Sequence, residues 1–125
     1  MEISLDEIIR YKKVKYNRCY TYGGIYLIYD TINKKYYVGK SIEFMQRLKS
    51  HYNNALRNSG IYIDKCMHNR ISDFKFYILA SYIELKINYF NRHEEIITEN
   101  AFINTYQSLY PNGYNKTYYG YLQTK

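Results

Sequence analysis

The sequence predicts a single domain of the mixed α/β (α+β) class. Its 125 residues suit one domain, which at this length buries roughly two thirds of the surface that the unfolded chain would expose. A strand–turn–strand pattern runs over 24–40, and a further β-branched and aromatic run covers 74–79. Apolar residues recur with helical periodicity after each of these segments, over 41–58 and 81–109. Strand and helix signals therefore occur together in one short chain.

A short helix is predicted at the N-terminus. Ser4 and Glu7 have the spacing of a capping box, in which each residue's side chain caps the backbone of the other. Leu5 and Ile8 begin an amphipathic pattern that continues to about Tyr16. We expect this helix to form an accessory layer on the domain.

The segments 24–30 and 36–40 are predicted to pair as a β-hairpin. Both alternate in side-chain character and are rich in β-forming residues, and Asn33-Lys34 between them has turn chemistry. A two-residue loop at Asn33-Lys34 would pair Asp30 with Tyr37. That register would place four residues on one face, namely Tyr26, Ile28, Tyr37 and Gly39. Both phenols would then face together, and Gly39 would leave backbone open to a phosphate or base. Ordinary aromatic packing is the alternative explanation for either tyrosine alone.

The remaining elements follow from periodicity and turn residues. A helix is predicted from Ser41 to about Asn58, followed by a shorter one over 64–71. The strand over 74–79 is compact and apolar enough to be central and buried. The helical pattern over 81–109 is longer than an ordinary globular helix, so we expect two helices with a break at 88–91.

Composition favours a soluble, intracellular protein with a polyanionic partner. Lys and Arg number 18 against 11 Asp and Glu, which gives a net charge of +7 and a pI near 9.3 and favours nucleic acid. An AT-rich genome is the alternative source of the 19 tyrosines and of much of the basic excess. No apolar run approaches the roughly 20 residues that cross a bilayer, and the N-terminus lacks a signal-peptide pattern. Cys19 and Cys66 have neither disulfide nor zinc spacing, as expected for reduced thiols.

The helix after the hairpin carries a basic pair. Arg47 and His51 are four residues apart and share one helical face beside the apolar stripe. A guanidinium matches phosphate oxygens and stabilises charge that grows on a phosphoryl group in a transition state. Taken singly, a solvated surface arginine and a hydrogen-bonded histidine at the edge of the core are the simpler explanations.

Glu99 lies in the apolar stripe of the last predicted helix. A carboxylate is rarely placed in a core stripe unless it is paired or bound to a metal. One carboxylate, with waters and substrate phosphate oxygens, is the usual way to hold Mg²⁺. Glu95 is one turn earlier and points nearly the same way, so spacing leaves it open as the ligand or as a partner of Arg92.

Together these residues resemble the GIY-YIG endonuclease family. The family's pattern is Gly-Ile-Tyr, about ten residues, Tyr-Ile/Val-Gly, an arginine, a nearby histidine or tyrosine, and a distant glutamate. The matching positions of this chain are Gly24-Ile25-Tyr26, Tyr37-Val38-Gly39-Lys40, Arg47, His51, Glu99-Asn100 and Gly113-Tyr114-Asn115. The resemblance spans 24–115, looks closest to the nuclease domain of phage intron-encoded homing endonucleases, and favours Glu99 over Glu95.

This resemblance implies a small three-stranded antiparallel sheet flanked by helices, and hydrolysis of DNA phosphodiesters assisted by one Mg²⁺ or Mn²⁺ ion. By position, Glu99 would hold the metal, Arg47 would stabilise the pentacovalent phosphate, and Tyr26 or Tyr37 would prepare the attacking water. The assisting and bracing positions that it implies are Lys40, His51, Gly24, Gly39 and Asn115. A free phenol has a pKa of about 10, so it acts as a base near neutrality only if Arg47, Lys40 or the metal favours its ionised form.

The expected organisation is an N-terminal accessory helix and lead-in over 1–22, a nuclease domain over 23–115 and a short tail over 116–125. Homing relatives usually continue past the Gly-Tyr-Asn segment into a linker and a DNA-binding domain. We therefore expect a stand-alone endonuclease, encoded by a virus, phage or mobile element, that needs two passes or two protomers to cut both strands. The alternatives are a structure-selective nuclease acting on branched or flapped DNA, and a non-catalytic nucleic-acid-binding module.

Overall fold

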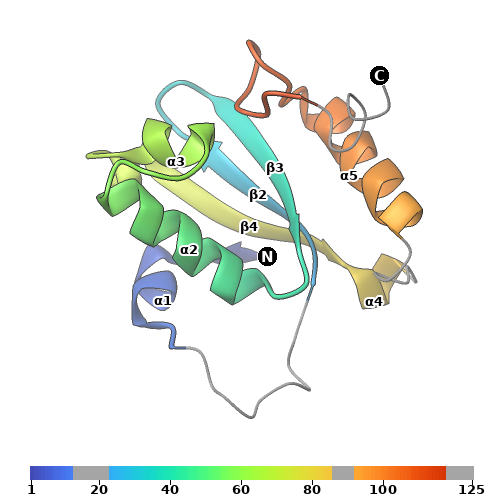
Figure 1. Cartoon of the computed structure of the whole chain (residues 1–125), viewed down its shortest axis with the longest axis horizontal. Helices are drawn as coiled ribbons and strands as arrows, with labels where there is room; N and C mark the ends of the chain where they lie inside the picture. The colour runs from blue at the N-terminus through green and yellow to red at the C-terminus, as the bar shows by residue number, and fades with distance from the viewer. Residues whose placement is uncertain (13–22, 86–91, 118–125) are drawn as a thin grey trace.

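The computed structural model describes residues 1–12, 23–85 and 92–117, which form an antiparallel sheet with helices on both faces (Figure 1). This sheet has four strands in the spatial order β1 (Glu2–Ile3), β4 (Phe74–Ser81), β2 (Gly24–Asp30) and β3 (Lys35–Ser41). The predicted mixed α+β class is confirmed. The expected number of three strands is wrong by one, because Glu2 and Ile3 pair with β4 and add a short edge strand.

Five α-helices and one 3₁₀ turn complete the described part of the chain. They are α1 (Leu5–Arg10), α2 (Phe44–Leu56), α3 (Tyr62–Met67), η2 (Ile71–Asp73), α4 (Tyr82–Leu85) and α5 (Arg92–Tyr106). In Figure 1, α2 crosses one face of the sheet, whereas α5 lies beyond β3, the edge strand of the hairpin. Strand β3 is therefore the element that separates the two long helices.

The predicted hairpin is present, but its register differs from the expected one by two residues. Asp30 pairs with Lys35 and Ile28 pairs with Tyr37, so the loop has four residues instead of two. The Asp30 carboxylate accepts hydrogen bonds from the backbone N–H groups of Ile32 and Asn33, and this turn geometry favours the longer loop. Because side chains alternate with a period of two, a slip of two residues leaves every side chain on its predicted face.

Helix α2 is two to three residues shorter at each end than predicted. Ser41 is the last residue of β3, and its hydroxyl accepts a hydrogen bond from the backbone N–H of Glu43, so the helix begins only at Phe44. At the other end, Asn58 adopts a φ of +51°, in the left-handed region, and ends the helix as the Asn58-Ser59-Gly60 run predicts.

The core consists of two layers, one on each face of the sheet. On the α2 face, Tyr26 and Ile28 of β2 pack with Phe44 and Leu48 of α2. On the other face, the buried residues that pack together come from β2, β3 and α5, namely Ile25, Leu27, Val38 and Ile103. Successive residues of β2 thus face opposite layers, which explains why this strand is apolar almost throughout.

The N-terminal helix is confirmed but shorter than predicted. Ser4 and Glu7 form the expected capping box, and α1 ends at Arg10 with Tyr11 in an extended conformation. The predicted extension to Tyr16 therefore fails at Tyr11, and residues 13–22, with Cys19, lie outside the described part. Ile8 is fully buried against the same layer as α2, which makes α1 the accessory element that its sequence indicates.

The later elements follow their predicted order. Strand β4 starts at Phe74, as expected, and lies centrally between β1 and β2. Helix α3 begins two residues before its predicted start and ends at Met67, because His68 and Arg70 turn the chain toward η2. The 81–109 segment holds two helices, α4 and α5, as predicted; the expected break at 88–91 falls in residues that the structure does not describe.

Candidate active site

Tyr26 and Tyr37 lie next to each other on the α2 face of the hairpin. Their ring centroids are 6.2 Å apart, and Tyr26 is almost completely buried. Gly39 pairs with Tyr26 across the two strands, and the Tyr26 ring lies against the position that a Gly39 side chain would occupy. The predicted shared face is confirmed, but the expected open backbone at Gly39 is wrong, because the Tyr26 ring covers it.

His51 joins this pair from α2. Its Nε2 lies 2.7 Å from the Tyr26 hydroxyl, and its ring meets both tyrosine rings edge to face, at 5.6 Å from Tyr26 and 5.7 Å from Tyr37. The imidazole is fully buried. Burial lowers the pKa of His51, and the Arg47 charge lowers it further, against the opposing effect of the Asp64 carboxylate. The His51 imidazole is therefore neutral where it contacts the two phenols.

Asp64, near the start of α3, completes a hydrogen-bonded row of three side chains. His51 Nδ1 hydrogen-bonds to Asp64 Oδ1, so the row runs Tyr26–His51–Asp64. Sequence reasoning missed Asp64, because an acidic residue in the first turn of a short helix is ordinary. Only its burial, with 1% of its surface exposed, distinguishes it from other helix-start acids.

Arg47 lies one turn before His51 on the same helix, and its charge acts on Tyr26. Burial raises the pKa of Tyr26 well above its ordinary value and raises that of Tyr37 to about 12, whereas the Arg47 charge lowers both. The guanidinium therefore faces both phenols. As the site stands, both tyrosines carry their protons at neutral pH.

Glu99 reaches this group from α5. It is 4% exposed, and its Oε1 has no hydrogen-bond partner among the described residues. Burial raises the pKa of Glu99 to about 7; Lys40 lowers it and Glu95 raises it. The Glu99 charge also raises the pKa values of both Tyr26 and Tyr37, so the carboxylate lies near the aromatic pair although it belongs to the opposite helix layer.

Lys40 and Glu95 form an ion pair beside Glu99. Lys40 Nζ lies 3.4 Å from Glu95 Oε2, and both side chains are largely buried. The two glutamates that the sequence leaves open as metal ligands thus differ in their surroundings. Glu95 is paired with the Lys40 ammonium group, whereas one oxygen of Glu99 has no partner within the described ranges.

Asn115 and Gly24 support the hairpin from outside. The Asn115 amide accepts a hydrogen bond from the backbone N–H of Val38 and donates one to the Val38 carbonyl, at 2.9 and 2.8 Å. Gly24 has a φ of +152°, and a side chain there would lie 2.7 Å from Cα of Ser81 on β4. These contacts hold the backbone on either side of the residues that face α2. Their importance for activity stays a prediction.

The residues present fit a single divalent cation that takes most of its ligands from water and from the phosphate of the substrate. No group of three or more His, Cys, Asp and Glu side chains suited to a metal occurs within 1–12, 23–85 and 92–117. Glu99 offers one buried oxygen without a partner, and its raised pKa shows that the isolated charge is costly there. A cation with most of its ligands from water and phosphate would relieve that cost.

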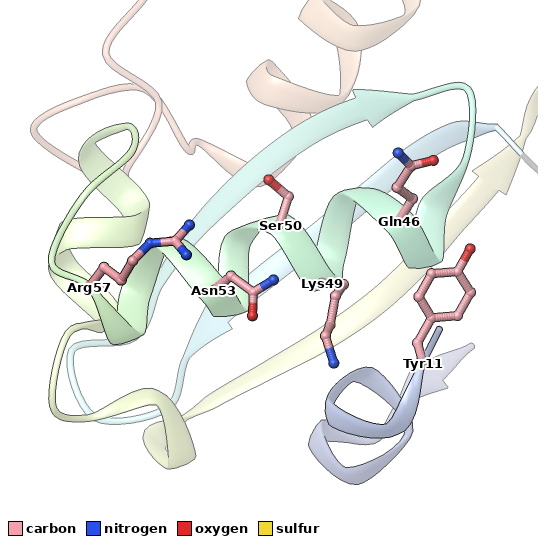
Figure 2. A pocket seen from close by; sticks show the side chains of 6 residues that line it. All are labelled: Tyr11, Gln46, Lys49, Ser50, Asn53 and Arg57. Atoms are coloured by element: carbon pink, nitrogen blue, oxygen red, sulfur yellow. The ribbon is translucent and has the colours of Figure 1, made fainter. Parts of the chain in front are cut away.

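A separate polar pocket lies between α1 and α2 (Figure 2), on the side of α2 that faces away from the sheet core. Its volume is about 360 Å³, and none of the residues that line it is acidic: Tyr11, Gln46, Lys49, Ser50, Asn53 and Arg57. It shares α2 with Arg47 and His51 but contains neither residue.

Within the described residues, no helix is long and apolar enough to span a membrane.

Comparison with protein families gives one match. Residues 22–115 match the family described as the GIY-YIG catalytic domain. The match covers β2 to the Asn115 contact and leaves out β1 and α1. No curated protein sequence matches the chain significantly.

Two similar solved structures are both of the catalytic domain of the homing endonuclease I-TevI. The first, of an intron endonuclease mutant with one glutamate replaced by alanine, has 29% identity and a TM-score of 0.64, over 78% of this chain and 95% of that one. The second has 29% identity and a TM-score of 0.63, over 76% of this chain and 98% of that one. The similarity thus covers nearly all of that catalytic domain.

Proposed function

The chain belongs to the GIY-YIG family, and from this membership and the geometry of its site we propose that it is a divalent-metal-dependent DNA endonuclease of the homing type. The observation that carries the proposal is the position of Glu99. Glu99 is a buried carboxylate with an oxygen that has no partner in the described structure, and its charge acts on two phenols that face the other side of the sheet. No packing requirement explains such a placement.

The charges of the site suit an in-line attack of water on a phosphodiester. Arg47 lies at the phenols, where its charge would neutralise negative charge that develops on the phosphate oxygens. Glu99 would hold a Mg²⁺ or Mn²⁺ ion. When bound, such an ion would supply Lewis acidity that offsets the negative charge of the phosphate. Lys40, held by Glu95, keeps a positive charge near Glu99 and so favours its ionised form.

Tyr26 and Tyr37 are the candidates for preparing the water. Their raised pKa values mean that a phenolate forms only with help from neighbouring groups. Arg47 lowers both pKa values, and His51 Nε2 lies where it can accept the Tyr26 proton. Each site has one such set of groups and cuts one phosphodiester, so a double-strand cut needs two passes or two protomers.

The test is nicking of supercoiled plasmid DNA in Mg²⁺ or Mn²⁺. We expect the parent chain to nick and linearise the plasmid, and EDTA to stop the reaction. Glu99→Gln and Arg47→Ala should each lower the single-turnover rate roughly 10²-fold or more, as is typical when an electrostatic stabiliser of a transition state is removed. The matched control is Glu94→Gln, which makes the same change at an exposed position of α5 and should keep the parent rate.

Two other outcomes of these assays would identify an alternative function, and a third would change the role of Glu99. Salt-sensitive DNA binding without any cleavage would identify a binding module instead of an enzyme. Preferential cutting of a junction or flap over linear duplex would identify a structure-selective nuclease. Equal rates for the parent and Glu99→Gln would remove Glu99 from the role of metal ligand.

A further inference from the structure

We propose that Asp64 is a positioning residue, which holds His51 in the tautomer that carries hydrogen on Nδ1 and so keeps Nε2 free to accept the Tyr26 proton. The proposal rests on the proposed function for its consequence in catalysis. Which ring nitrogen of His51 carries the hydrogen can be measured without DNA.

The Asp64 carboxylate is held in place from three directions. His51 Nδ1 hydrogen-bonds to Oδ1, and Oδ2 accepts from the Ile61 backbone N–H at 3.1 Å and from Asn54 Nδ2 at 3.3 Å. Asp64 and His51 are both buried. The carboxylate therefore cannot turn away without losing partners in a region that excludes water.

This arrangement selects one of the two neutral forms of His51. A carboxylate only accepts hydrogen bonds, so the ring nitrogen that faces it has to donate. Nδ1 then carries the hydrogen, and the lone pair of Nε2 points at the Tyr26 hydroxyl, 2.7 Å away. In the other tautomer, the Nδ1 lone pair would face the Asp64 carboxylate, which is repulsive. Without Asp64, nothing described at Nδ1 would favour the productive form.

The consequence is a defined path for one proton. When the Tyr26 O–H bond breaks, the hydrogen forms a bond to His51 Nε2, and the resulting imidazolium is stabilised by the Asp64 carboxylate. The electron pair stays on the Tyr26 oxygen, beside the Arg47 guanidinium. Tyr37 meets the same imidazole only through an edge-to-face ring contact. Asp64 thus gives the two phenols different roles.

A structural role is the competing explanation, because Asp64 also accepts the backbone N–H at the start of α3. The two explanations differ in what they predict for the His51 ring. We therefore choose long-range ¹H–¹⁵N NMR of the histidine side chains, which reports directly which ring nitrogen is protonated. Three histidines are present, and the His51 signals are assigned by their loss in His51→Gln.

In the parent chain we expect the Nδ1–H tautomer. In Asp64→Asn, whose amide can donate to Nδ1, we expect the Nε2–H form to appear and kcat for plasmid nicking to fall about 10²-fold with little change in KM. Asn54→Ala removes one donor to Oδ2 but leaves the contact with His51 Nδ1. It serves as the control, and it should keep the Nδ1–H tautomer even where it lowers the melting temperature.

An Nε2–H tautomer in the parent would overturn the proposal, whatever the variants do. So would an Asp64→Asn variant that keeps both the Nδ1–H tautomer and the parent kcat. Should the parent carry the Nδ1–H tautomer but cleave no DNA, the positioning of His51 by Asp64 stands and the proposed endonuclease function fails.

Discussion

At the scale of single residues, Gly39 decides how the Tyr26 ring is placed. A Cβ at Gly39 would clash with Cζ and the hydroxyl of Tyr26 and would lie 2.7 Å from its Cε2. Tyr26 is buried and hydrogen-bonded to His51, so it has no empty space to move into. The glycine of the Tyr-Val-Gly triplet is therefore required by a neighbouring aromatic ring and not by a turn.

We predict that Gly39→Ala lowers both stability and activity. Overpacking of this kind costs about 1–3 kcal/mol in the free energy of unfolding, and displacement of the Tyr26 hydroxyl should lower the nicking rate at least about tenfold. Chemical denaturation and plasmid nicking measure the two effects. The control is the same substitution in a Tyr26→Ala background, where the ring is gone and the stability cost should largely disappear. An equal cost in both backgrounds would show that the clash with Tyr26 is not its cause.

At the scale of elements, Asp30 ties three parts of the fold together. Its carboxylate, at the end of β2, accepts hydrogen bonds from Arg70 between α3 and η2, at 2.8 and 3.1 Å, and from the Tyr114 hydroxyl at 2.6 Å. Burial alone would raise the pKa of Asp30, but these hydrogen bonds and those from the hairpin loop outweigh it and lower the pKa to about 2. The hairpin loop, the segment after α3 and the C-terminal segment thus all donate hydrogen bonds to the Asp30 carboxylate.

We predict that this cluster stabilises the fold in a pH-dependent way. The pKa of Asp30 is lower in the folded chain than its ordinary value of 3.8, so the ionised form favours folding. The stabilisation, about 2 kcal/mol, is fully present above about pH 4 and is lost as the pH falls toward 2. Denaturation of the parent and of Asp30→Asn should therefore give a difference that shrinks over this interval.

The control for that measurement is Asp6→Asn, which changes an exposed pair with Arg10 on α1. It should leave the pH dependence of the parent unchanged. A difference between the parent and Asp30→Asn that stays constant from pH 7 to pH 2 would contradict the role assigned to the Asp30 charge.

At the scale of the whole molecule, α2 also carries basic residues outside the candidate active site. Lys49 and Arg57 line the polar pocket between α1 and α2 (Figure 2), and none of the six lining residues is acidic, although the Tyr11 hydroxyl donates to the Glu43 carboxylate. Lys49 also donates to the carbonyl of Ile9 and so joins α1 to α2. Arg47 lies on the same helix but faces Tyr26, so the proposed DNA substrate would have to contact a second face of α2 to reach this pocket.

We predict that Lys49→Ala and Arg57→Ala each weaken DNA binding and lower its dependence on salt. Each lost phosphate contact should lower the slope of log K against log salt by about one unit, because fewer counterions are released on binding. Fluorescence anisotropy with a labelled duplex, over a salt series, measures both quantities. Lys75→Ala is the matched control, since Lys75 is exposed on β4, on the face opposite α2. A slope that falls equally in Lys75→Ala would place the DNA elsewhere.

The faces of the hairpin could be predicted from the sequence although its register could not. Alternation along the strand is local, and it placed Tyr26 and Tyr37 together even with an error of two residues. The loop length depends instead on the Asp30 carboxylate, which also binds Arg70 and Tyr114, 40 and 84 positions away. The start of α1 followed from Ser4 and Glu7, and the end of α2 near Asn58 followed from its turn residues, for the same local reason.

What the sequence by itself determined is therefore the set of elements and the side-chain faces, and its family pattern supplied the candidate residues of the site apart from Asp64. Only the tertiary structure decided that the Glu99 charge acts on both phenols, that Glu95 is paired with Lys40, and that Asp64 hydrogen-bonds to His51. The physical reason is that periodicity reports the direction of a side chain from its own element. Charge pairing and burial depend on which other elements pack against it, and those lie far apart in the chain.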